Sequence, residues 1–168
     1  DQSSPISRAT LCDQLHRYKP NAPIVESIHN PCAFIEIADW YKNDGSKALP
    51  LEALKGQEVM VFSAIGNPSS FEQTMAGEGL QIAEAIRYPD HHDYGMVEMQ
   101  YIMERAISKR VTALVTTGKD AVKIPTEFIY LHREDPLYVL DMEIQITSGE
   151  EAFVKTITTA IEKENKRQ

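Results

Sequence analysis

The stretch Val59-Met-Val-Phe-Ser-Ala64 decides the fold class, because its apolar side chains are interrupted by only one serine. A strand covered on both faces reads as such a continuous run, whereas a half-exposed strand alternates apolar and polar residues. Gly66-Asn67-Pro68 follows and predicts a helix start, since Asn67 is a favoured N-cap and Pro68 loses no hydrogen bond at the first helical position. A buried strand that leads into a helix predicts a parallel sheet flanked by helices.

The alternation of strand and helix continues downstream. A helix with Phe71 and Met75 on one face is expected first, with Gly79 as its left-handed end, and a strand over 81–88 follows. The next helix ends near Lys109-Arg110 and is expected to bury Met99, Ile102, Met103, Ala106 and Ile107. A strand over 112–116, extended segments over 137–140 and 142–146, and a last helix complete the pattern. That last helix opens on Ser148 with capping-box spacing, and it is expected to bury Phe153, Ile157, Ala160 and Ile161.

The first 57 residues follow a different pattern. A helix is expected around Leu11 and Leu15, with prolines ending it before residue 24, and a short strand over 24–28. The span 30–55 is irregular, with a turn at 43–46, and predicts a long connection or a small exposed insertion. We therefore expect a connecting segment over 1–57, packed on an α/β domain over 58–168.

The predicted architecture is a three-layer αβα fold with a mainly parallel, Rossmann-like sheet. In such sheets ligands bind beyond the carboxyl ends of the strands. The loops Ile65-Gly66-Asn67, Pro89-Asp90-His91-His92 and Thr116-Thr117-Gly118-Lys119-Asp120 all follow expected strands. They are therefore predicted to lie along one edge of the sheet.

Composition narrows the classes of function. The chain has 168 residues, 42% of them hydrophobic, and a net charge of −8, which argues against a nucleic-acid partner because tracking phosphates needs a basic surface. Its two cysteines form no C-x-x-C motif and indicate neither a disulfide framework nor a structural zinc site. No apolar run is long enough to predict a membrane span. The chain begins at Asp1 rather than at methionine, which suggests a piece of a longer polypeptide.

The loop over 89–93 allows three interpretations. Asp90 or Asp93 could simply cap the next helix, with the histidines exposed beside it. A histidine beyond a strand end could instead act as a general base, because imidazole ordinarily titrates at about pH 6.5. A metal site is a weaker interpretation, because adjacent histidines point in different directions and no ligand cluster accompanies them.

The other two loops carry weaker signals. Lys119 and Asp120, next to Gly118, could hold a phosphate or a purine edge, or could form an ordinary turn with a surface ion pair. Gly66, just before a helix start, could contact an anion, although a single glycine is a weak signal for an anion-binding site. The sequence contains no G-x-x-x-x-G-K-[ST], so it predicts no nucleoside triphosphate cradle of its own.

Taken in order, three motifs resemble the C-terminal half of the tetraacyldisaccharide 4'-kinases of lipid A synthesis. They are 62–71 (Phe-Ser-Ala-Ile-Gly-Asn-Pro-Ser-Ser-Phe), 88–94 (Tyr-Pro-Asp-His-His-Asp-Tyr) and 114–123 (Leu-Val-Thr-Thr-Gly-Lys-Asp-Ala-Val-Lys). The resemblance is strong over 58–146 and weaker over the first 55 residues. The family differs at one position: it usually has glutamate where this chain has Gly118.

The resemblance implies a relative of P-loop kinases that lacks the P-loop half. In that family ATP and Mg²⁺ are bound mainly by an N-terminal half, which would be the partner of this chain, and the substrate is a lipid A disaccharide precursor. His91 would be the base, or the base's partner, that takes the proton from the sugar hydroxyl, and Asp90 would orient its loop. Gly66, Asn67, Thr117, Lys119 and Asp120 are implied as substrate- or nucleotide-binding residues, and no metal ligand is assigned in this chain.

The resemblance also implies where the complete protein is located and what this chain does alone. The complete protein would be cytoplasmic and peripheral at the inner membrane, while this chain alone would be soluble and inactive. Two other interpretations stay open at this point. One is a non-catalytic, acidic α/β module for ligand binding or interaction, and the other is a metal-dependent hydrolase.

Overall fold

The computed structural model describes residues 5–42 and 48–165. The turn expected at 43–46 lies outside the described residues. By their internal contacts the residues form two compact units, one made of Asp1–Asn30 with Glu143–Gln168 and the other of Pro31–Met142. The expected domain boundary at residue 57 stays a prediction.

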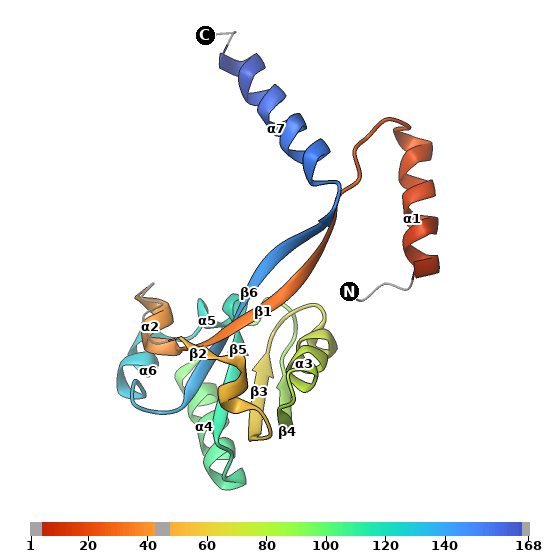
Figure 1. Ribbon diagram of the computed structural model, residues 1–168. Coiled ribbons are helices and arrows are strands. Elements are labelled where there is room, and N and C mark those ends of the chain that lie inside the picture. The colour runs from red at the N-terminus through yellow and green to blue at the C-terminus, as the bar shows by residue number, and fades with distance from the viewer. Residues whose placement is uncertain (1–4, 43–47, 166–168) are drawn as a thin grey trace. The chain divides into compact units, whose positions relative to one another are not determined.

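The sheet has six strands in the order β2-β1-β6-β5-β3-β4 (Figure 1). Their bounds are β1 Glu26–Glu36, β2 Leu49–Pro50, β3 Glu58–Ser63, β4 Gln81–Arg87, β5 Ala113–Thr117 and β6 Leu137–Ser148. β3 runs parallel to β4 and β5, and β5 runs parallel to β6, whereas β1 and β2 are antiparallel. The prediction of a mainly parallel sheet is confirmed.

Helices flank this sheet on both faces within Pro31–Met142, and two further helices, α1 and α7, belong to the other unit. Their bounds are α1 Pro5–Tyr18, α2 Ile37–Tyr41, the 3₁₀ helix η2 Leu51–Leu54, α3 Pro68–Gly77, α4 Met96–Lys109, α5 Gly118–Ala121, α6 Thr126–Leu131 and α7 Glu150–Asn165. The start of α3 is as predicted, because Oδ1 of Asn67 accepts the Ser70 N–H at 3.2 Å. Gly79 has φ of +83°, so the left-handed end is confirmed as well.

Alternate side chains of β3 enter two separate cores, which makes the domain three-layered. Met60 and Phe62 pack with buried residues of α2, α4, α5 and α6. Val59 and Val61 pack with the buried side of α3 and with η2. α3 and α4 accordingly lie on opposite sides of the sheet (Figure 1). The predicted αβα layering is confirmed.

The region over 30–55 is more regular than expected. β1 continues through Pro31 to Glu36, and α2 follows at once. Phe34 and Ile37 are fully buried, at 0% and 1% exposure, so this region belongs to the core and is not an exposed insertion. On the side of β2 the proline interrupts no pairing, because β2 pairs with β1 only at Ala33 and Phe34, beyond Pro31.

α4 buries most of its expected apolar stripe. Met99, Ile102, Met103 and Ala106 are buried, as predicted. Ile107 is not, since it is 68% exposed. It lies at the margin of the stripe in the last turn of α4, where a three- and four-residue spacing no longer determines burial.

An ion pair joins β4 to α4 and gives a prediction about pH. Nη2 of Arg105 donates to both carboxylate oxygens of Glu84, at 2.8 and 2.7 Å. This hydrogen bond lowers the pKa of Glu84 below its ordinary value of 4.5, against the effect of desolvation. A lowered pKa means stabilisation that is complete above the unfolded value and lost as the pH falls through the folded one.

We therefore expect Glu84→Gln to be slightly less stable than the wild type at pH 7 and equally stable well below pH 4.5, the ordinary carboxyl value. Urea unfolding at several pH values measures the difference. Glu104→Gln is the matched control, because Glu104 is an exposed carboxylate on α4, next to Arg105. A difference between the Glu84 variant and the wild type that did not shrink at low pH would contradict this account.

The last helix departs most from expectation. Phe153, Ile157 and Ile161 of α7 are 41%, 43% and 56% exposed, and Ala160 is exposed too, so their predicted burial is wrong. The capping residue was also misassigned, because Ser148 belongs to β6, and Gly149, with φ of +82°, precedes the helix. The two extended segments expected over 137–146 are one strand, β6. α1 is likewise exposed at Leu11 and Leu15.

Candidate functional site

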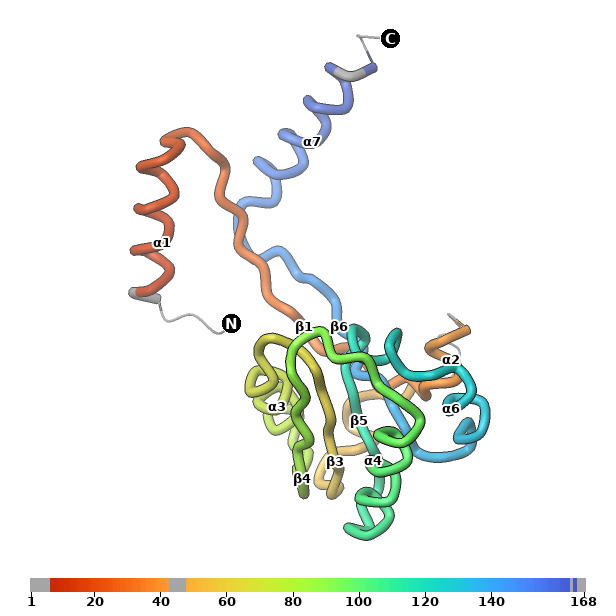
Figure 2. The backbone as a smooth tube through the Cα atoms, turned by 180° about the vertical axis from the view of Figure 1, so that it is seen from behind, coloured from red at the N-terminus to blue at the C-terminus, as the bar shows by residue number. Residues whose placement is uncertain are grey.

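The order of the strands determines where a site can form. From β3 the chain passes by α3 to β4 on one side, and from β4 it returns by α4 to β5 on the other side of β3. Figure 2 shows β3, β4 and β5 side by side. Loops that leave neighbouring strands toward opposite faces open a crevice at the carboxyl ends, which is where α/β sheets bind ligands.

The three predicted loops meet at this edge. The backbone N–H of Ala64, directly after β3, donates to Oδ1 of Asp120 at 2.9 Å. The carbonyl of Ala64 accepts the N–H of His91 at 3.3 Å. A Cβ on Gly66 would stand 3.3 Å from Oδ2 of Asp90, so the loop after β3 also touches the loop after β4. The prediction that the loops share one edge is confirmed.

His91 projects into solvent from a left-handed backbone. Its side chain is 89% exposed, and its φ is +64°, a conformation uncommon outside glycine. Oδ1 of Asp90 accepts the His91 N–H at 3.0 Å, while Oδ2 lies 3.6 Å from Nε2 of the imidazole. This distance is too long for a hydrogen bond but short enough to attract an imidazolium cation.

His92 turns the other way and fixes the loop. Its Nε2 lies 2.9 Å from Oε1 of Glu98, and its ring stacks on Tyr88 with centroids 4.6 Å apart. Oε2 of Glu98 accepts the N–H of Gly95, which precedes α4. Asp90 and Asp93 therefore do not cap this helix, and the simplest interpretation of the loop, a pair of exposed histidines beside an aspartate cap, is wrong.

Asp120 lies inside the protein. It is 0% exposed, Oδ1 also accepts the hydroxyl of Tyr94 at 3.2 Å, and Oδ2 accepts the hydroxyl of Thr117 at 2.7 Å. Nζ of Lys123 is 4.0 Å from Oδ1. Burial raises the pKa of the Tyr94 phenol well above its ordinary value, and the charge of Asp120 raises it further. The alternative of a turn with a surface ion pair is therefore wrong for Asp120, whereas Lys119 is exposed.

The remaining predicted residues lie in the loops at the same edge of the sheet. Gly66 and Asn67 are exposed at the start of α3, and Thr117 is partly buried. At Gly118, a Cβ would lie 3.5 Å from Cζ2 of Trp40, an ordinary contact distance. A longer side chain at this position would meet the indole ring of Trp40.

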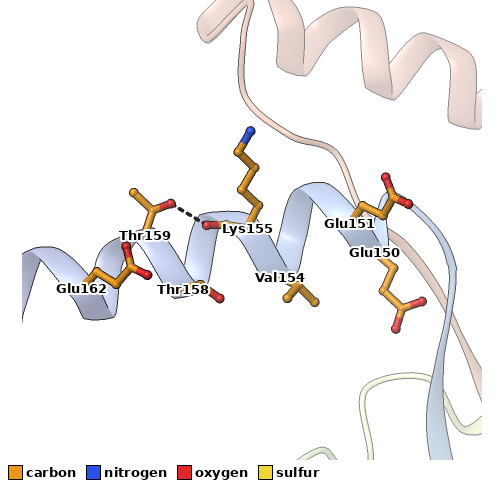
Figure 3. Close-up of a pocket in the computed structure, with 7 residues that line it drawn as sticks. All are labelled: Glu150, Glu151, Val154, Lys155, Thr158, Thr159 and Glu162. Carbon is orange, nitrogen blue, oxygen red and sulfur yellow. Dashed lines mark hydrogen bonds between the residues drawn. The ribbon is translucent and has the colours of Figure 1, made fainter.

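Other candidate sites are poorer. No group of at least three His, Cys, Asp or Glu side chains in 5–42 and 48–165 could hold a metal ion. An open hollow lies along α7 and is lined by Glu150, Glu151, Val154, Lys155, Thr158, Thr159 and Glu162 (Figure 3). All seven come from one helix, and Figure 3 shows their side chains spread along it without converging on a point. In the described ranges no helix is long and apolar enough to cross a membrane.

Two residues of the site have structural partners that the sequence did not reveal. Tyr94 is 4% exposed and binds Asp120, and Glu98 binds both His92 and the start of α4. Tyr94 ends the stretch Tyr-Pro-Asp-His-His-Asp-Tyr over 88–94, and Glu98 stands three residues after Gly95, the spacing of a capping box. Both sequence signals were present, but neither indicated which groups Tyr94 and Glu98 would contact.

Comparison with solved structures shows the fold. The chain is similar to LpxK from Aquifex aeolicus, solved as the "apo" form in complex with ATP, with a TM-score of 0.51 and 21% identity over 86% of this chain and 40% of that one. At this identity the likeness establishes a shared architecture. It agrees with the α/β fold described above.

Sequence comparison is more specific. The tetraacyldisaccharide 4'-kinase of Syntrophus aciditrophicus is 34% identical over 127 residues, covering 75% of this chain and 31% of that protein. The enzyme of the same name from Elusimicrobium minutum is 32% identical over 151 residues, covering 90% and 37%. The chain thus spans about a third of the length of these curated relatives. The family model described as tetraacyldisaccharide-1-P 4'-kinase matches residues 8–162. The chain therefore belongs to the tetraacyldisaccharide-1-P 4'-kinase family, LpxK.

Proposed function

We propose that this chain is the C-terminal part of an ATP-dependent lipid kinase that phosphorylates the 4'-hydroxyl of a tetraacyldisaccharide 1-phosphate in lipid A biosynthesis. On its own the chain is inactive, because the groups that bind the triphosphate belong to the rest of the polypeptide. The observation that carries this proposal is the exposed imidazole of His91 at the carboxyl edge of the sheet, in a chain of the kinase family.

His91 acts as the general base or as its partner. When the sugar oxygen attacks the γ-phosphorus and the bond to the ADP leaving group breaks, the hydroxyl proton passes to the imidazole. Asp90 supports this step in two ways: Oδ1 fixes the His91 backbone, and the carboxylate attracts the imidazolium that forms. Positioning accounts for most of the acceleration in phosphoryl transfer, so an oriented base supplies only part of it.

The binding residues in this proposal line the same crevice. Gly66, Asn67, Thr117 and Lys119 contact the substrate or the nucleotide. Asp120 was expected among them, but its carboxylate is buried and bound by neighbouring groups of the chain, so we give it a different role below.

ATP and Mg²⁺ are bound mainly by the N-terminal half of the complete polypeptide. Bound Mg²⁺ would offset negative charge on the phosphates. The described residues of this chain do not fit a magnesium site, because they gather no cluster of suitable ligands. No step assigned to this chain passes through the metal.

That N-terminal half is also the proposed partner of the exposed apolar side chains of α7. Phe153, Ile157 and Ile161 recur at helical spacing and are about half exposed, the pattern of a helix face that packs against another surface. The curated relatives are long enough to supply it, since this chain covers 31% and 37% of two of them. In the complete protein we place the enzyme at the cytoplasmic face of the inner membrane, as a peripheral protein.

A kinase assay tests the division of labour. This chain and the complete polypeptide are each incubated with ATP, Mg²⁺ and the tetraacyldisaccharide 1-phosphate, and transfer of the γ-phosphate is measured. We expect turnover by the complete protein only. Robust turnover by this chain would refute the proposed incompleteness, and a complete protein that binds the disaccharide without phosphorylating it would favour a non-catalytic binding module.

A further inference from the structure

A buried carboxylate joins the loops of the site. Removing an aspartate from water is costly unless hydrogen bonds satisfy it, and Asp120 is 0% exposed. Its donors come from all three segments: the N–H of Ala64 after β3, the hydroxyl of Tyr94 in the loop before α4, and the hydroxyl of Thr117, the last residue of β5. The carboxylate oxygens of Asp120 therefore bind groups of the protein and are not accessible to a substrate.

A two-step path leads from this carboxylate to His91. Ala64 donates its N–H to Oδ1 of Asp120 at 2.9 Å, and its own carbonyl accepts the N–H of His91 at 3.3 Å. Three residues after His91, the buried hydroxyl of Tyr94 returns to the same Oδ1 at 3.2 Å. Both ends of the segment 91–94 are therefore held, directly or through Ala64, by one oxygen atom.

His91 needs such support. Its backbone has φ of +64°, and a left-handed conformation costs a residue with a Cβ free energy that the surroundings must supply. The side chain cannot help, because it is 89% exposed. The structure supports it through the hydrogen bonds of its backbone N–H, to Asp90 and to Ala64, and through the turn that the His92 N–H closes by donating to the Pro89 carbonyl at 3.1 Å.

We propose that Asp120 is a positioning residue that aims His91 at the crevice by fixing Ala64 and Tyr94. This inference rests on the proposed function, since the orientation of His91 affects turnover only if its imidazole takes part in the phosphoryl transfer. Asp120 touches neither substrate nor nucleotide, and its hydrogen-bonding oxygen matters more than its charge.

The test is a double-mutant cycle in the complete protein. Asp120→Ala is expected to lower kcat by about a hundredfold, with KM for both substrates within about twofold, because a base displaced by about an ångström costs on that order. In a His91→Ala background the same change is expected to cost less than about twofold, because there is no base left to aim. Asp120→Asn keeps an oxygen acceptor for Ala64 and Tyr94, and is expected to lose at most about tenfold.

Hydrogen–deuterium exchange of the complete protein supplies a readout independent of activity. Asp120→Ala is expected to speed exchange of the His91 amide by about tenfold, the equivalent of one hydrogen bond. The matched control is Thr116→Val, which removes another buried hydrogen bond, from the Thr116 hydroxyl to the Phe62 carbonyl at 2.9 Å, without touching the loop of His91. It is expected to leave both kcat and the His91 amide unchanged.

Each result has one meaning. Additive losses from Asp120→Ala and His91→Ala, or an Asp120→Asn variant as impaired as Asp120→Ala, would overturn the inference by showing a direct role for the carboxylate charge. Equal effects of Thr116→Val and Asp120→Ala would reduce Asp120 to a general stabiliser. Full turnover by His91→Ala alone would instead overturn the proposed function, and the exchange rates would then decide whether Asp120 holds the loop. Should Asp120→Ala fail to fold, Tyr94→Phe removes only one donor and is expected to give a smaller loss that His91→Ala likewise abolishes.

Discussion

Replacing His91 by alanine in the complete protein is expected to lower turnover by about a hundredfold to ten-thousandfold, the range over which a general base contributes. ATP affinity is expected to stay within about twofold, because in our proposal the nucleotide is held by the N-terminal half. The side chain is 89% exposed, so its loss should leave folding nearly unchanged. Steady-state kinetics with the disaccharide acceptor and a separate ATP-binding measurement check both parts.

The choice of control follows from the backbone at this position. His91 has φ of +64°, which asparagine tolerates better than alanine does. His91→Asn therefore removes the base with less backbone strain, and it should lose as much turnover as His91→Ala. Wild-type turnover in either variant would remove His91 from the chemistry, and a loss confined to alanine would mean that the backbone, not the imidazole, is what matters.

The largest effect on stability is expected from Phe62→Ala. The side chain of Phe62 is 0% exposed in the core under α4, and its ring meets that of Tyr94 edge-on at 5.4 Å. Truncation of a buried phenylalanine ordinarily costs about 3–5 kcal/mol, from lost transfer free energy and from the cavity. Urea unfolding of this chain, with the two-state assumption tested, measures the loss.

Phe153→Ala is the matched control, because it is the same substitution on an α7 side chain that is 41% exposed. We expect it to cost less than about 1 kcal/mol in this chain. Similar losses for the two variants would contradict the assignment of Phe62 to the core and of Phe153 to an open face.

The central part of the fold could be predicted because its signals are local. The apolar run at 59–64 is buried on both sides, and Asn67 caps α3, both as expected. The exposure of α7 could not be predicted, since helical spacing reveals that a helix has an apolar face but not what covers it. The strand through Pro31 was not predicted, because Asn30-Pro31 is a dipeptide that ordinarily marks a turn.

Of the site, only the positions of its loops could be predicted, because they follow from the order of strands and helices. Strand ends placed the loops of Gly66, His91 and Asp120 on one edge, as the structure has them. The burial of Asp120 was not predictable, since an aspartate after a strand is ordinarily exposed. Hydrogen bonds from Ala64 and Tyr94, which are distant in the sequence, offset the free-energy cost of burying its carboxylate. The functional roles of these residues stay predictions.

The tryptophan beside Gly118 gives this loop an optical reporter. Trp40 is the only tryptophan in the sequence, it is partly buried, and its Cζ2 faces the loop that begins α5. Indole fluorescence responds to the polarity around the ring, and the tryptophan emission, excited selectively over that of the seven tyrosines, comes from this one residue next to that loop. Movements of the loop on titration with a ligand can therefore be followed without attaching a dye.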